Sequence, residues 1–114
     1  MEDIDIDQIE ALGGFGSPDL IEILQDFLDG LDAHALNLVS LLENGDREAF
    51  RESVHRLKGG AQMSGFPKLG ELATTWEDLA RTESSPLPAK DELQLKLTPA
   101  IHAARCAFSH HRTD

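Results

Sequence analysis

Apolar side chains recur at helical spacing along most of the chain, in segments separated by Gly, Pro and short polar stretches. The longest segment runs from Pro18 to about Glu43, with one short segment before it and three after it. The apolar positions, in chain order, are Ile4, Ile6, Ile9 and Leu12; Leu20, Ile23, Leu24, Phe27, Leu31, Ala35, Leu38 and Leu42; Phe50, Val54, Leu57 and Ala61; Leu69, Leu72, Ala73, Trp76, Leu79 and Ala80; and Leu93, Leu97, Ile101, Ala104 and Phe108. No stretch alternates as a convincing strand would. The pattern predicts one short and four longer helices.

The boundaries of these segments carry capping residues. Ser17 precedes Pro18, which gives an N-cap followed by proline at the first helical position. Residues 44–46, Asn-Gly-Asp, end the longest helix and cap the next. Because this link is so short, we expect the two helices to form an antiparallel hairpin. Pro67 opens the following helix in the same way as Pro18.

Two residues interrupt the pattern inside predicted helices. Gly30 lies in the middle of the longest one and predicts a bend. Pro99 lies within the last one and removes a backbone donor, so we expect a kink or break near residues 95–99. Alternatively, Thr98 and Pro99 cap a separate final helix.

These elements predict an all-α protein, an antiparallel up-down-up-down four-helix bundle with a short extra N-terminal helix. Its 114 residues form a single predicted domain, residues 1–114, large enough to bury about two-thirds of its unfolded surface. No apolar run approaches the ~20 residues of a membrane span. The single cysteine, Cys106, excludes an internal disulfide and a cysteine-based zinc site.

The net charge of −11 is unevenly distributed. Residues 1–46 contain twelve acidic residues and no Lys or Arg, whereas residues 47–68 contain five basic residues against two acidic ones. A strongly negative body repels a phosphate backbone, which argues against nucleic-acid binding. The acidic N-terminus is unlike a signal peptide, so we expect a cytoplasmic protein. The positive island in residues 47–68 suits an acidic partner or a phosphoryl group.

The positive island surrounds His55, which lies off the apolar stripe of its predicted helix. Lys58 and Gly59 follow three and four positions later, on the same helical face. Gly59 and Gly60 each cost roughly 1 kcal/mol of helix stability relative to alanine. A glycine one turn from an exposed imidazole lets another protein approach closely, which indicates a functional reason for the pair.

This stretch resembles the histidine-containing phosphotransfer (HPt) family, whose pattern is His-x-Leu-Lys-Gly, a small residue, and Gly ten positions after the His. The matching residues are His55, Leu57, Lys58, Gly59, Gly60 and Gly65. The flanking helices and the length agree, so the resemblance covers nearly the whole chain. It implies a phosphoryl carrier of a bacterial two-component phosphorelay, taking phosphate from a receiver-domain aspartate or a kinase and passing it to a response regulator.

The resemblance also implies roles for individual residues. His55 would carry the phosphoryl group on Nε2, Lys58 would neutralise its charge, and Gly59 and Gly60 would keep the approach open. Glu77 lies 22 positions after His55, where the family places the residue that accepts the Nδ1 proton. A carboxylate there would orient the ring, although a solvated surface acid is the alternative reading. Candidate partner contacts are Arg51 and Gln62.

The same resemblance implies no cofactor of the chain's own, with Mg²⁺ expected in the partner receiver domain. The partners would be receiver domains of a hybrid histidine kinase, a response regulator, or both, bound by a monomer. No nucleotide-binding Gly-x-x-x-x-Gly-Lys loop is present, so we expect a phosphotransfer intermediate rather than an ATP-using enzyme.

Other readings of His55 compete with this one. Glu52 and His55 have the Glu-x-x-His spacing of di-iron bundles, but no other histidine has Glu three residues before it, which argues against a metal site. A structural histidine would face the core, whereas the apolar stripe lies elsewhere. A non-phosphorylated adaptor bundle that binds receiver domains stays open, although an adaptor has no need of a nucleophile.

Overall fold

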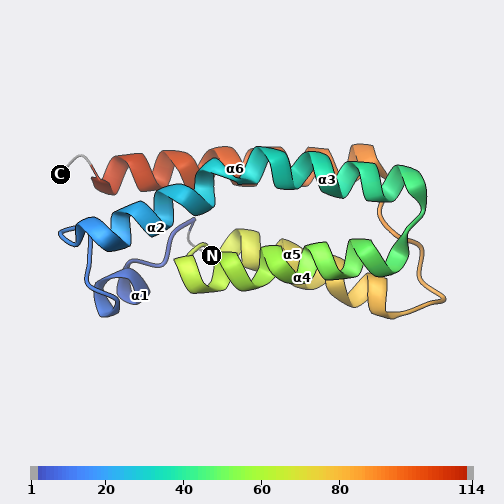
Figure 1. The fold of residues 1–114 in the computed structure, drawn as a ribbon, viewed down its shortest axis with the longest axis horizontal. Coiled ribbons are helices and arrows are strands. Elements are labelled where there is room, and N and C mark those ends of the chain that lie inside the picture. Colours follow the sequence, from blue (N-terminus) through green and yellow to red (C-terminus); the bar gives the residue numbers. More distant parts are fainter. Residues whose placement is uncertain (1–2, 113–114) are drawn as a thin grey trace.

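The computed structural model describes residues 3–112, and this range is all-helical, as predicted. The helices within it are α1 (Ile6–Ala11), α2 (Pro18–Asp29), α3 (Leu31–Asn44), α4 (Arg47–Ser64), α5 (Pro67–Arg81) and α6 (Lys90–Arg112). In Figure 1, α2, α3 and α6 form one layer and α4 and α5 the other, while α1 lies under α2 at one end. Successive helices from α3 to α6 run in opposite directions (Figure 1).

The predicted caps are confirmed at the starts of α2 and α4. Ser17 Oγ accepts a hydrogen bond from the backbone N–H of Leu20, at 3.3 Å. Asp46 Oδ1 accepts one from the backbone N–H of Ala49, at 3.1 Å. Each bond satisfies a helix N-terminal donor that has no partner within the helix. Gly45 ends α3 at φ 69°, a left-handed conformation that favours glycine.

The two predicted interruptions have different outcomes. Gly30 separates α2 from α3, and Figure 1 shows α2 leaving the line of α3 and descending toward α1. The prediction of a break or a separate final helix at Pro99 is wrong, because α6 continues through this residue. Pro99 and Leu95 both lie on the exposed side of α6, so the carbonyl that loses its donor can be solvated.

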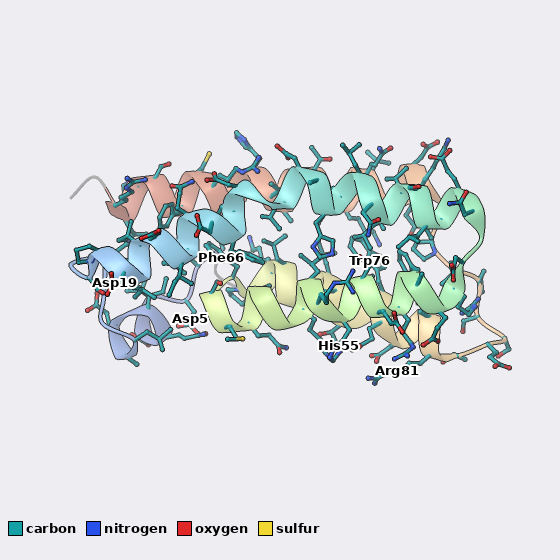
Figure 2. All side chains as sticks on the ribbon, viewed as in Figure 1. Asp5, Asp19, His55, Phe66, Trp76 and Arg81 are labelled. Carbon is teal, nitrogen blue, oxygen red and sulfur yellow. The ribbon has the colours of Figure 1, made fainter. Side chains whose placement is uncertain are left out.

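The core lies between the two layers. Phe66 and Trp76 point into it from the α4–α5 side (Figure 2). The most extensive contact in the fold joins α4 to α5, and α4 also packs against α2 and α3. Helix α4 is therefore covered on most sides and presents one free face, which is where the candidate site lies.

Candidate functional site

His55 lies on the outer face of α4. The residues of the buried stripe around it, Val54 and Leu57, are at most 1% exposed, whereas the His55 side chain is 61% exposed. Figure 2 shows His55 projecting from the edge of the molecule, away from the core. The prediction that His55 is off the core is confirmed, which excludes an ordinary core histidine.

Glu77 meets His55 from the neighbouring helix α5. Its Oε2 lies 2.6 Å from His55 Nδ1, and the glutamate is 1% exposed. An ionised carboxylate can only accept hydrogen bonds, so Nδ1 must carry the proton that it donates. In a neutral imidazole this leaves Nε2 without a proton and with a free lone pair. The alternative reading of Glu77 as a solvated surface acid is wrong.

Lys58 binds the other oxygen of the same carboxylate. Its Nζ donates a hydrogen bond to Glu77 Oε1, and the lysine side chain is 20% exposed. Burial alone would raise the pKa of the Glu77 carboxyl, but the hydrogen bonds from Lys58 and His55 outweigh burial and hold this pKa below its usual value. The buried glutamate is therefore ionised at neutral pH. Lys58, which we expected to face a phosphoryl group, is occupied by Glu77 in the structure.

Arg81 is a member of this cluster that the sequence pattern did not reveal. It lies one turn after Glu77 on α5, and its Nη2 is 3.5 Å from Glu77 Oε2, the oxygen that accepts from His55. The Arg81 side chain is 54% exposed and projects near His55 in Figure 2. The spacing of Glu77 and Arg81, four positions on one helix, was the signal available in the sequence.

The two adjacent glycines of α4 differ in their surroundings. A Cβ added at Gly59 would meet nothing within 4 Å, which agrees with an open approach beside His55. A Cβ added at Gly60 would lie 2.7 Å from Cε1 of Phe27, whose ring stacks on Phe66. Gly60 therefore admits the Phe27 ring of α2, a packing role that the sequence did not indicate, while its part in partner clearance stays a prediction.

We predict that alanine substitutions at these two glycines have opposite effects on stability. Gly59→Ala should raise the free energy of unfolding by up to about 1 kcal/mol, because alanine favours the helix and meets no neighbour. Gly60→Ala should lower it by about 1–3 kcal/mol, because Phe27 must shift. Urea unfolding of the two variants measures both values. Shifts of the same sign would contradict the distinction.

The remaining predicted site residues lie near His55 without contacting it. Arg51, one turn earlier on α4, is paired with Glu48 and is half-exposed. Gln62, two turns later, has an exposed side chain, and its backbone carbonyl accepts a hydrogen bond from Gln8 Nε2 of α1. Both residues are placed where a partner covering His55 could reach them, and neither belongs to the Glu77 cluster.

A mostly apolar groove lies at the C-terminal end of α4, between this helix and α1 and α2. It is lined by Gly60 and Met63 of α4 together with Leu12 and Ile23. Leu12 and Ile23 belong to the apolar positions at helical spacing, but their side chains are 53% and 60% exposed, and Met63 is 77% exposed. No neighbouring helix covers these three side chains, so the groove presents an apolar surface to solvent.

His34 of α3 has a partly buried, hydrogen-bonded environment. Its Nε2 lies 2.9 Å from the carbonyl oxygen of Ser53 and 3.1 Å from its Oγ, which also accepts from Asn37 Nδ2. Burial lowers the pKa of His34, with the hydrogen bond to Ser53 opposing that effect. His34 thus joins α3 to α4 as a half-buried, neutral group.

Residues 3–112 contain neither a metal-binding cluster nor a helix suited to crossing a membrane. No group of three or more His, Cys, Asp or Glu side chains there is arranged to hold a metal ion. None of the helices in the same range combines the length and apolar character that crossing a membrane requires.

Comparison with known proteins gives one result. A sequence model of the Hpt domain family matches residues 22–105, which include the whole His55–Glu77 cluster. Searches among curated proteins and among solved structures gave no match. The family match covers most of the chain and contains the exposed histidine with its carboxylate partner. The chain belongs to the Hpt domain family, the histidine phosphotransfer domains of phosphorelays.

Proposed function

We propose that this protein is a phosphoryl carrier in a bacterial two-component phosphorelay, with His55 as the phosphorylated residue. Nε2 of His55 would attack the phosphorus of a receiver-domain aspartyl phosphate, forming the N–P bond as the O–P bond breaks and the aspartate carboxylate leaves. The reverse reaction on a second receiver domain would complete the relay. The observation that carries the proposal is the hydrogen bond between His55 Nδ1 and buried Glu77, beneath an exposed ring.

The surrounding charges suit this chemistry. Phosphoryl transfer depends mainly on positioning and on neutralising charge. Glu77 fixes the ring and stabilises the positive charge that the imidazole gains when Nε2 bonds to phosphorus. Arg81, exposed and beside the ring, is the cation best placed to meet the phosphoryl oxygens, with Lys58 able to follow if it leaves Glu77. The chain itself would need no cofactor and would not act as an enzyme, the Mg²⁺ belonging to the receiver domain.

The fold supports the same proposal. We assign four members to an antiparallel up-down bundle: α2 and α3 together form the first, and α4, α5 and α6 form the other three. Helix α1 is an added helix, and we treat residues 1–114 as one domain. We propose a cytoplasmic monomer, because receiver domains are its partners. The competing function is an adaptor that binds receiver domains without being phosphorylated. An adaptor would have no need of a buried carboxylate, Glu77, that keeps the proton of His55 on Nδ1.

Labelling with radioactive phosphate tests the proposal. The protein is incubated with a panel of receiver domains phosphorylated on aspartate and, separately, with phosphoramidate, a small phosphoryl donor that requires no docking surface. We expect label that is labile to acid and stable to base, as for a phosphohistidine. Stable binding of receiver domains with no label from either donor would favour the adaptor function and contradict the carrier.

The apolar groove beside His55 is the expected docking surface. A specific interface covers roughly 800 Å² on each partner. Met63 lies two turns beyond His55 on α4, about 12 Å along the helix axis. A receiver domain centred on His55 therefore covers Gly59 and reaches the groove between Met63, Leu12 and Ile23.

We predict that Met63→Glu slows phosphoryl transfer from a receiver domain by about tenfold at low partner concentration, because a charge replaces an exposed apolar contact of the docking surface. Leu95→Glu is a matched control: Leu95 is 76% exposed, against 77% for Met63, but lies on α6 outside the groove. It should transfer within about twofold of the original protein. Equal slowing by both variants would place the docking surface elsewhere.

A further inference from the structure

The bend between α2 and α3 determines where α2 lies, and therefore the shape of the apolar groove. Past the bend, α2 places Phe27 on Gly60 and Ile23 along the groove that Gly60 and Met63 line on α4. In Figure 1, α2 leaves the upper layer at this bend and approaches α1. If α2 continued in line with α3, these side chains would leave α4.

Gly30 alone does not impose the bend. Its φ of −82° is open to any residue, and a Cβ there would be 3.6 Å from the Asp26 carbonyl oxygen, an ordinary contact. Glycine weakens a continuous helix but does not choose a direction for the bend. The direction must be set by contacts from another element.

Besides the apolar packing of Leu24 and Leu28, Arg105 of α6 contacts both sides of the bend. Its Nη2 donates a hydrogen bond to the Leu28 carbonyl oxygen, at 2.7 Å, and its Nη1 lies 3.2 and 3.3 Å from the two carboxylate oxygens of Asp32. Leu28 is in the last turn of α2, where its carbonyl is also approached by the backbone N–H of Gly30, and Asp32 is in the first turn of α3. One guanidinium thus binds both sides of the bend.

The charges favour this arrangement on both sides. The carbonyl end of α2 carries the negative end of its dipole, which attracts a cation. Asp32 adds a full negative charge at the start of α3. The planar guanidinium has donors in a fixed fork, so it can serve the carbonyl and the carboxylate together, which a lysine ammonium does less well. The Arg105 side chain is about one-third exposed, and its bond to the Leu28 carbonyl is partly buried, whereas the Asp32 carboxylate is largely exposed to water.

We infer that Arg105 is a positioning residue for receiver docking: from α6 it fixes the α2–α3 bend and thereby holds the face of α2 that builds the groove beside His55. This inference rests on the proposed function, since the groove matters only if a receiver domain covers it. Arg105 touches no reacting atom, so its loss should weaken docking and leave the chemistry of His55 unchanged.

The test compares Arg105→Ala, Arg105→Lys and Arg112→Ala with the original protein. Arg112 is a matched control, because it also lies on α6 and also binds α2, through the Gln25 side chain at 2.9 Å, but far from the bend. Three measurements are made below the unfolding temperature of every variant. They are the labelling rate with phosphoramidate, KM and kcat with the receiver domain that labels the original protein, and the methyl NMR shifts of Ile23 and Met63.

We expect Arg105→Ala to raise KM by about five- to tenfold and to change kcat and phosphoramidate labelling by less than about twofold. The Ile23 and Met63 methyl signals should shift. Arg105→Lys should raise KM less than Arg105→Ala does, and Arg112→Ala should match the original protein in all three measurements.

Unchanged KM and unchanged methyl shifts in Arg105→Ala would overturn the inference, and so would an equal loss of phosphoramidate labelling, which would indicate damage to His55 itself. If the original protein accepts no label from either donor, the proposed function fails. In that case unmoved methyl signals in Arg105→Ala overturn the inference, and shifted signals retain its structural half, that Arg105 holds α2.

Discussion

His55→Gln should abolish phosphoryl labelling from both receiver domains and phosphoramidate while leaving the fold intact. The glutamine amide has no lone pair that attacks phosphorus, so no carrier atom replaces Nε2. Its NH₂ group can still donate to Glu77, which keeps the buried carboxylate partnered beside Lys58. Because the His55 side chain is 61% exposed, the free energy of unfolding should change by no more than about 0.5 kcal/mol.

Circular dichroism and scintillation counting measure the two outcomes, and His102→Gln is the control. His102 is exposed on α6 and lies 3.5 Å from the Cys106 thiol, with no role in the Glu77 cluster, so this variant should label fully. His34 is half-buried and its Nε2 is hydrogen-bonded to Ser53, so this atom should not be able to attack phosphorus. Label that persists in His55→Gln, or that mass spectrometry places on His34 or His102, would refute the assignment.

The features that the sequence predicted well are those decided within a few residues. The caps at Ser17 and Asp46 depend on a side chain reaching a backbone N–H three positions on, and both form. The interruption at Gly30 follows from local helix propensity. The contact between His55 and Glu77, 22 residues apart, was reached through the family pattern, because no local rule places two helices side by side.

The features that the sequence did not predict depend on what packs against each residue. The sequence does not distinguish the adjacent residues Gly59 and Gly60. In the structure Phe27 packs against Gly60, whereas the space beside Gly59 is open. Pro99 does not end α6, because its side of the helix faces water. Ile23 follows the helical period of its apolar neighbours, yet no neighbouring helix covers it and it is 60% exposed. In each case the outcome depends on whether a neighbouring helix or water surrounds the residue, which the local sequence does not specify.

Glu77 carries a negative charge and is the most buried of the four side chains in its cluster. Removing one partner from a buried ion pair usually destabilises a protein, because it leaves a charge without compensation. Here the charge left behind would be that of Lys58, which is partly exposed and can turn toward water. Because the pKa of the Glu77 carboxyl lies below its usual value, its bond to His55 persists at neutral pH and is lost only as the pH falls into the acid range.

Glu77→Ala should therefore slow phosphoryl transfer without abolishing it. Without its acceptor, the proton of the neutral His55 ring is shared between Nδ1 and Nε2, so fewer rings present a bare Nε2 to phosphorus. The positive charge that the ring gains on phosphorylation also loses its carboxylate partner. We expect about a ten- to hundredfold loss in rate, the scale seen when groups supporting a ligating histidine are removed.

Glu77→Gln separates the hydrogen bond from the charge. Its amide oxygen can still accept the Nδ1 proton, so the tautomer should be retained and the loss in rate should be the smaller of the two. Nitrogen NMR shifts of the His55 ring report the tautomer ratio directly in the three proteins, and phosphoramidate labelling reports the chemical step without docking. Identical tautomer ratios and identical rates in all three would show that the 2.6 Å contact between Nδ1 and Oε2 has no part in the reaction.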